Sequence, residues 1–262
     1  MGGVGYRIFK VGKGLYRVEK ADGSFYLVNL DAETCTCKGF VAFGRCKHVP
    51  LVQGYVLAKV EEGLTDLKDI ILRQLAFTHV KETEDYVICY DELPCSLDRG
   101  CIIDIETTGM DHEKDEIITF GMIERNELRV IQRKSKDPAA FYAYLSENVL
   151  SRLPLPVYAY NSEFEKGFLS KQLGFEATFV DLMEPWRVKA DEVEFKYPTL
   201  DELIPSPEAY IGERRTTAMD VVFLWRKYLR EANVRDLATI IRHNQIDLLQ
   251  AMAALMFESL VK

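Results

Sequence analysis

Residues 101–111 read CIIDIETTGMD, a stretch that joins an unbroken apolar run to two acids and a turn signal. Side chains alternate across a β-strand, so Asp104 and Glu106, two residues apart, are predicted to lie on one face of a strand. Thr107 and Thr108 begin the turn that follows and offer backbone N–H groups and small side chains beside the acids. Two carboxylates that face the same way repel each other, and divalent cations relieve that repulsion.

Strand and helix patterns alternate from residue 100 onwards and predict an α/β domain with a mixed sheet and flanking helices. Apolar runs predict strands over 101–105, 117–123, 128–132, 157–160 and 178–182. The second and third of these are expected to be antiparallel neighbours of the first. Helical spacing predicts helices over 139–150 and 163–173 and two or three helical pieces over 217–230, 234–243 and 244–261.

The N-terminal sixty residues predict a small, separate β-rich module. Alternating segments at 6–10, 15–19 and 25–30, with a turn at Asp22-Gly23, predict an antiparallel meander, and a helix is expected over 48–60. Residues 61–99 have mixed polarity apart from one expected helix over 65–77. We therefore expect three parts: a module at 1–60, a connecting segment at 61–99 and the α/β domain at 100–262.

Composition points to a soluble protein. Of the 262 residues, 48% are hydrophobic, yet no run approaches the roughly 20 apolar residues that cross a bilayer. The first ten residues lack the apolar stretch of a secretory signal. Six cysteines are too few for a disulfide scaffold in a chain of this length. We expect a cytoplasmic protein that makes no contact with membranes.

The net charge of −8 hides an asymmetry along the chain. Residues 1–60 carry nine Lys or Arg against four Asp or Glu, whereas the rest of the chain carries 24 against 37. A basic module can contact phosphates while an acidic domain holds cations. Ordinary solvated surface is the alternative reading of the same imbalance.

Four metal-ligand side chains lie within fourteen residues, in the spacing C-x-C-x8-C-x-H: Cys35, Cys37, Cys46 and His48. Tetrahedral Zn²⁺ favours such a closed set of thiolates and imidazole, which leaves no open position for catalysis. A structural zinc ion is therefore predicted, and it would supply much of the folding energy of so small a module. Incidental thiols or a redox pair are the alternative.

The stretch CTCKGFVAFGRCKH, placed after short strands, resembles a SWIM-type zinc finger over about residues 5–55. The resemblance implies a module that binds DNA or a protein partner, and the sequence leaves open which of the two this finger binds.

Two later segments add to the acid pair. YAYNSEFEKGFLSKQL, residues 158–173, places Asn161 at a strand end and Glu165 in the first turn of the next helix. RHNQIDLLQAM, residues 242–252, puts His243 and Asp247 one helical turn apart on one face. Together with the acid pair they make four carboxylates and one possible base.

This whole pattern resembles the DEDD superfamily of 3′–5′ exonucleases with an RNase H-like fold, most closely its YprB-like branch, over about residues 100–260. The resemblance implies two-metal hydrolysis of phosphodiester bonds with two Mg²⁺ or Mn²⁺ ions. It implies that Asp104 bridges both ions, that Glu106 and Asp247 hold one, and that Glu165 helps to hold the other. His243 would orient or deprotonate the attacking water.

The expected substrate is a single-stranded DNA or RNA end, with substrate contacts from Thr107, Thr108 and Asn161. Two features depart from the family pattern: Glu165 stands where Asp is usual, and His243 has the four-residue spacing of the tyrosine subclass. These departures leave open an active site with unusual metal preference or a degenerate one. A catalytically silent nucleic-acid or protein binding module, a phosphodiesterase for short oligonucleotides and a structure-specific endonuclease are the other readings.

Overall fold

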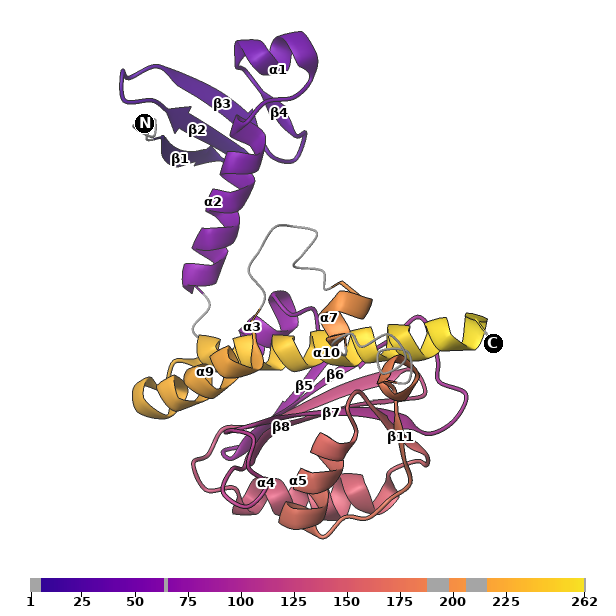
Figure 1. Ribbon diagram of the computed structural model, residues 1–262. Coiled ribbons are helices and arrows are strands. Elements are labelled where there is room, and N and C mark those ends of the chain that lie inside the picture. Colours follow the sequence, from indigo (N-terminus) through magenta and orange to yellow (C-terminus); the bar gives the residue numbers. More distant parts are fainter. Residues whose placement is uncertain (1–5, 64–65, 188–197, 206–215, 262) are drawn as a thin grey trace. The chain divides into compact units, whose positions relative to one another are not determined.

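The computed structural model describes residues 6–63, 66–187, 198–205 and 216–261, and the chain divides into two compact units, Met1–Thr65 and Asp66–Lys262 (Figure 1). Each unit has its own sheet and its own buried apolar cluster. Within the described ranges, no helix combines the length and the apolarity that crossing a bilayer requires.

The first unit is a four-stranded antiparallel sheet with two helices, which confirms the expected β-rich module. Its elements are β1 (Arg7–Gly12), β2 (Leu15–Glu19), β3 (Phe25–Asn29), β4 (Thr34–Cys35), α1 (Lys38–Phe43) and α2 (His48–Gly63), with the strands in chain order across the sheet. Alternate side chains of β2 and β3 point inward, so Tyr16, Val18 and Val28 are buried. They pack against Val49 and Val52 of α2 and against two of the clustered cysteines, so the small core and the cysteine cluster are one structure.

The second unit contains a seven-stranded mixed sheet, which confirms the expected α/β class. In spatial order its strands are β11 (Phe179–Asp181), β10 (Val157–Ala159), β7 (Cys101–Thr107), β8 (Ile117–Glu124), β9 (Glu127–Arg133), β6 (Tyr86–Glu92) and β5 (His79–Glu82). Strand β10 is parallel to β7 and β11, and the other pairings are antiparallel. Strand β7 pairs with β10 and β8 along its two edges and has helices packed on both of its faces, so most of its side chains are buried.

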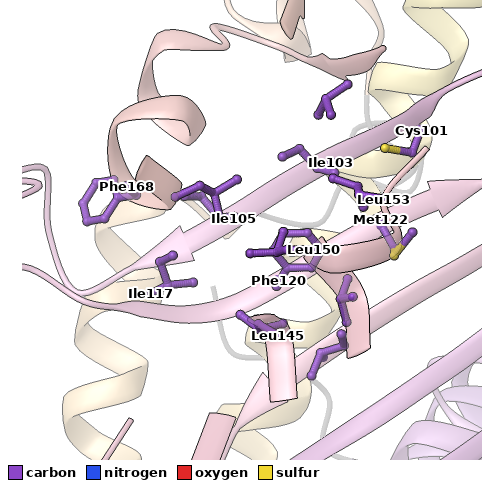
Figure 2. Packing of buried hydrophobic residues seen from close by; sticks show 14 of the residues in the cluster. Cys101, Ile103, Ile105, Ile117, Phe120, Met122, Leu145, Leu150, Leu153 and Phe168 are labelled. Atoms are coloured by element: carbon purple, nitrogen blue, oxygen red, sulfur yellow. The ribbon is translucent and has the colours of Figure 1, made fainter. Parts of the chain in front are cut away.

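Helices cover both faces of this sheet (Figure 1). One face carries α4 (Ala139–Tyr144), which continues through a π-helical turn (Leu145–Val149) and a 3-10 turn (Leu150–Arg152), and α5 (Glu163–Leu173). The other carries α3 (Leu67–Arg73), α9 (Ala218–Glu231) and α10 (Val234–Val261), with the short α7 (Leu200–Leu203) packed on α10. Figure 2 shows the apolar side chains between the sheet and the α4–α5 layer, including Ile103, Ile105 and Phe120. This packing sends the odd-numbered side chains of β7 toward α5 and the even-numbered ones toward the α10 face.

The last helix is continuous where the sequence allowed a break between His243 and Asn244. Asparagine favours helix caps because its side chain competes for backbone hydrogen bonds. In α10 the amide of Asn244 instead donates to Asp104 on β7, so it does not compete with the helix backbone. The described part of the helix contains neither proline nor glycine, and it runs unbroken to Val261.

The structure differs most from the sequence-based prediction in residues 61–99, which were expected to be a connecting segment. They contain α3 and the two strands β5 and β6, and these strands extend the large sheet beyond β9. Strand β6 pairs with β9 along seven residues, and its Val87, Ile88 and Cys89 are fully buried. These residues are buried because β6 pairs with β9, which lies 35 or more positions later in the chain, so the local hydrophobic pattern gives little indication of the strand.

Candidate functional site

One cavity, of about 210 Å³, brings together all five side chains that the sequence proposed as catalytic. Asp104 and Glu106 come from β7, Glu165 from the first turn of α5, and His243 and Asp247 from α10. The cavity thus forms where the C-terminal end of β7 meets α5 on one face of the sheet and α9 and α10 on the other. The remaining lining residues are Ile105, Thr107, Gly109, Met110, Phe164, Ala218, Met219 and Val222.

Two carboxylates and an imidazole form the tightest part of this cavity. His243 Nε2 lies 3.8 Å from Glu106 Oε1 and 3.7 Å from Asp247 Oδ2. One oxygen or nitrogen atom from each of the three residues lies within 4.8 Å of the other two, so a cation held by the two carboxylates would lie beside the imidazole. Glu106 and His243 are each only 6% exposed, so the negative charge of the Glu106 carboxylate is poorly solvated and would strongly attract a cation.

Glu165 is a buried carboxyl group in the wall of the same cavity. It is 3% exposed, and burial raises its pKa to about 8, with a smaller contribution from the negative charge of Asp181 and an opposing one from a backbone N–H. Its Oε2 atom has no hydrogen-bond partner among the described residues. A buried carboxylate oxygen without a donor is costly unless a proton or a cation satisfies it. The residues present therefore fit a divalent metal ion.

Asp104 is held by a residue that sequence reasoning missed. Asn244 Nδ2 donates to Asp104 Oδ2 at 2.6 Å and to the backbone oxygen of Asp104 at 3.3 Å. The available signal was the position of Asn244, directly after His243 and three residues before Asp247, on a helix whose inward face was predicted.

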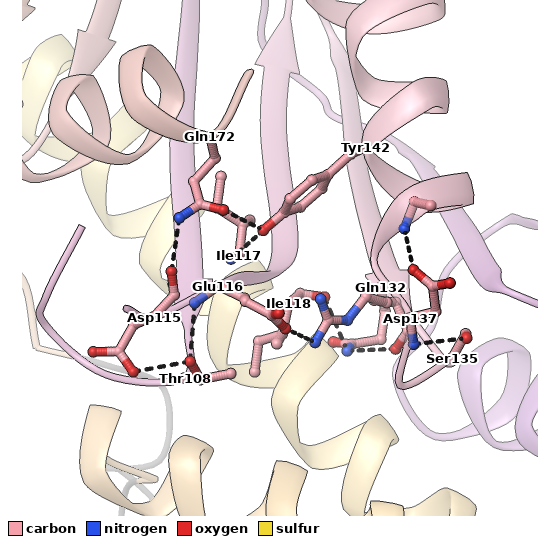
Figure 3. Close-up of polar contacts among 12 residues, drawn as sticks. Thr108, Asp115, Glu116, Ile117, Ile118, Gln132, Ser135, Asp137, Tyr142 and Gln172 are labelled. Atoms are coloured by element: carbon pink, nitrogen blue, oxygen red, sulfur yellow. Dashed lines mark hydrogen bonds and ion pairs between the residues drawn. The ribbon is translucent and has the colours of Figure 1, made fainter. Parts of the chain in front are cut away.

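Of the three residues proposed to contact substrate, only Thr107 lines the cavity. Thr108 braces the loop after β7: its hydroxyl donates to Asp115 Oδ1 at 3.0 Å and accepts the N–H of Glu116 at 2.9 Å. Figure 3 shows that Gln172 of α5 joins this network by donating to the backbone oxygen of Asp115. The loop is thereby tied to the helix that carries Glu165.

Asn161 braces the turn between β10 and α5. Its backbone has φ 65°, its N–H donates to Asp181 Oδ1 at 3.0 Å, and its Oδ1 accepts from Arg187 at 2.7 Å. Arg187 also forms an ion pair with Asp181 at 2.8 Å. Asn161 therefore fixes the start of α5, and with it Glu165, from outside the cavity.

The rim of the cavity is apolar and exposed. Met110, in the loop after β7, is 75% exposed, and Met219, in the first turn of α9, is 79% exposed. Isolated methionines gave no signal in the sequence, because their position at the rim depends on how α9 packs beside β7. Flexible apolar side chains beside a polar cavity offer a contact surface to the flat faces of a ligand.

A second cluster, in the first unit, contains the four predicted zinc ligands. Ligand atoms of Cys35, Cys37, Cys46 and His48 all lie within 4.8 Å of one another. Cys35 Sγ lies 3.7 Å from His48 Nδ1, close to the separation of about 3.6 Å between a sulfur and a nitrogen ligand of tetrahedral Zn²⁺. Tyr26 stacks on the His48 ring with centroids 4.6 Å apart, which fixes the ring with Nδ1 toward the thiols. The cluster fits a zinc site.

The thiols of the cluster differ in their local environment. Burial raises the pKa of Cys35 to about 12. Burial also opposes ionisation of Cys37, but the N–H groups of Phe40 and Gly39 and the neighbouring thiols together hold the pKa of Cys37 below its ordinary value. The Phe40 N–H lies 3.3 Å from Cys37 Sγ at the start of α1. Such N–H···S contacts are what a metal-bound thiolate accepts from its surroundings.

Comparison with known proteins bears on the second unit. The profile of the family RNase_H_2, described as RNase H superfamily, matches residues 101–258. A solved structure described as the apo form of a nuclease is similar over 62% of this chain and 75% of its own, with 12% identity and a TM-score of 0.32. The search of curated proteins gives no match.

Proposed function

Because the chain belongs to the RNase H superfamily, we propose that it is a nuclease that hydrolyses phosphodiester bonds with two Mg²⁺ or Mn²⁺ ions, releasing nucleotides from a 3′ end. The observation that carries the proposal is the convergence of Asp104, Glu106, Glu165, His243 and Asp247 in one cavity. The 3′–5′ direction rests on the resemblance of these residues and their order to the DEDD exonucleases.

The five residues of the cavity would have two roles, metal binding and proton transfer. Asp104, Glu106, Glu165 and Asp247 would hold the ions, which when bound lower the pKa of a water molecule and balance the charge on the leaving oxygen. His243 Nε2, which lies 3.8 Å from a Glu106 oxygen and 3.7 Å from an Asp247 oxygen, would orient a water molecule and accept its proton. Glu165, at the position of the usual aspartate, lines the cavity from the first turn of α5, which supports a role for its longer side chain in metal binding.

Substrate would enter over the apolar rim. We propose that the exposed side chains of Met110 and Met219 contact the bases of an unpaired strand, because every base offers an apolar face. The narrow cavity beyond the rim would then receive a phosphate and its metal ions.

For the first unit we propose a SWIM-type finger that binds single-stranded nucleic acid and increases affinity for long substrates. The open face of its sheet carries Phe9 and Phe25, 44% and 49% exposed. Arg17 pairs with Phe9 across β1 and β2 and lies 4.2 Å from the centre of the Phe25 ring. Exposed aromatic rings beside arginine are a common stacking surface for bases.

Three thiols in the zinc cluster also favour a reducing, cytoplasmic location.

The experiment uses single-stranded DNA and RNA labelled at the 5′ end, with Mg²⁺, Mn²⁺ or no added divalent ion. The wild type is compared with Asp104→Ala and with Glu163→Gln, an exposed acid on α5 that serves as control. A metal-dependent ladder that shortens from the 3′ end, absent in Asp104→Ala and retained in Glu163→Gln, supports the proposal. Internal cuts would favour an endonuclease. Intact substrate with folded, zinc-loaded protein would favour the silent binding module.

A further inference from the structure

We infer that Asn244 is a positioning residue that fixes the Asp104 carboxylate for metal binding; the inference rests on the proposed metal-dependent function. Asn244 does not line the cavity, so it would not contact the metal ions or the substrate directly. It acts through Asp104, which does line it.

The contacts clamp Asp104 from one side. The Nδ2 group donates to both the side-chain Oδ2, at 2.6 Å, and the backbone oxygen, at 3.3 Å, of the same residue. Two bonds from one amide to one residue restrict the rotation of the carboxylate relative to β7. A metal ligand whose orientation is fixed before binding loses less conformational freedom when the ion arrives.

The fold makes room for this contact. Gly121 on β8 lies directly across from Asp104 in the antiparallel register. A Cβ atom at position 121 would lie 2.0 Å from Asn244 Oδ1 and 2.9 Å from its Cγ. The missing side chain is therefore what lets the Asn244 amide reach Asp104, and it brings α10 close to the strand.

The close packing of α10 against the sheet also determines where the other side chains of α10 lie in the site. His243 and Asp247 lie one residue before and three residues after Asn244 on α10, so the register that seats Asn244 against β7 also places these two side chains. A shift of α10 would move all three together.

The chemistry of the side chain argues against a purely structural role. Asn244 is fully buried, and its Oδ1 atom has no hydrogen-bond partner among the described residues, so the amide is only half satisfied. An apolar side chain of similar volume would avoid that cost. A neutral amide also orients Asp104 without cancelling its negative charge, which Lys or Arg in this place would do, and the full charge stays available to a cation.

The test measures Mn²⁺ binding to the full-length, zinc-loaded protein, by the electron paramagnetic resonance signal of free Mn²⁺, together with kcat and KM on a labelled oligonucleotide. Asn244→Leu removes the donor at similar volume, and Asn244→Ala removes it with a smaller side chain. Asp104→Ala identifies the Mn²⁺ binding that belongs to this cavity. Gln250→Ala is the matched control, because Gln250 is a buried amide on the same helix that bonds to Asp201 and lies outside the cavity.

We expect both Asn244 variants to bind Mn²⁺ about 10- to 100-fold more weakly, with kcat reduced at limiting metal, KM little changed and zinc content unchanged. Gln250→Ala should lower the melting temperature and leave Mn²⁺ affinity at the wild-type value. If one Asn244 variant does not fold, the other decides.

Wild-type Mn²⁺ affinity in a folded Asn244 variant, or an equal loss in Gln250→Ala, would overturn the inference. A wild type that binds Mn²⁺ in the cavity yet cuts no nucleic acid would refute the proposed nuclease alone, because the affinities would still decide the role of Asn244. A wild type with no Mn²⁺ binding that Asp104→Ala abolishes would overturn both.

Discussion

Replacing Glu165 by Gln should change how the stability of the second unit depends on pH when no Mg²⁺ or Mn²⁺ is present. The pKa of Glu165 is raised from 4.5 to about 8, mainly by burial. Between these two values the folded protein keeps the proton and the unfolded chain releases it. The unfolded state then binds fewer protons, so this group's contribution to stability is present below pH 4.5 and is lost as pH rises toward 8.

The magnitude follows from the size of the shift. A difference of one bound proton changes the free energy of unfolding by about 1.4 kcal/mol per pH unit. From pH 5 to pH 8 the wild type should therefore lose up to about 4 kcal/mol relative to Glu165→Gln, because Gln carries no titrating group. Added Mg²⁺ should reverse the loss at pH 8, since a bound cation stabilises the ionised carboxylate.

The assay is urea unfolding at pH 5, 6.5 and 8, followed by tryptophan fluorescence. Both tryptophans, Trp186 and Trp225, belong to the second unit, so the signal reports that unit. Glu163→Gln, an exposed neighbour on the same helix, should follow the wild type at every pH. Parallel pH dependence in wild type and Glu165→Gln would show that the folded Glu165 carboxyl titrates normally, and the reasoning would be wrong.

Three further predictions concern other parts of the chain. Cys46→Ser should unfold the first unit and release zinc, because the cysteine cluster is part of that unit's small core, and it should leave the urea unfolding of the second unit, followed by tryptophan fluorescence, unchanged. Far-ultraviolet circular dichroism and a zinc assay check the loss of the first unit. Gly121→Ala should destabilise the second unit by about 1–3 kcal/mol in urea unfolding, since the new Cβ would overlap Asn244 and Leu248, and a cost near zero would contradict the packing. Phe9→Ala with Phe25→Ala should weaken binding of a long single strand and leave turnover of short oligomers unchanged, as fluorescence anisotropy and product assays would show; equal affinity for the long strand would refute the stacking surface.

The sequence alone predicted those parts of the molecule whose signal is local. The apolar run of β7 predicted a strand, whose alternating side chains put Asp104 and Glu106 on one face, and helical spacing put His243 and Asp247 on one face of α10. The start of α5 at Glu163 agrees with the expected helix, so Glu165 falls in its first turn.

Features that depend on contacts between distant segments were not predictable. Strands β5 and β6 are stabilised by pairing with β9, which the sequence near residues 79–92 does not encode. Asn244 had the local signature of a helix break, and only its approach to Asp104, across the gap left by Gly121, explains its place in a continuous helix. Thr108 and Asn161, which the sequence predicts at the substrate, form hydrogen bonds that brace loops, and these bonds depend on Asp115 and Asp181, which come from other parts of the chain.

We propose that side chains from β7, α5 and α10 form one metal site. The most direct measurement is a crystal structure of the zinc-loaded protein grown with Mn²⁺, with anomalous diffraction recorded at the manganese absorption edge. We expect anomalous peaks in the cavity beside Asp104, Glu106 and Asp247, with Glu165 turned toward them, and their loss in Asp104→Ala. A cavity without manganese at saturating Mn²⁺, or peaks confined to other surface acids, would contradict it.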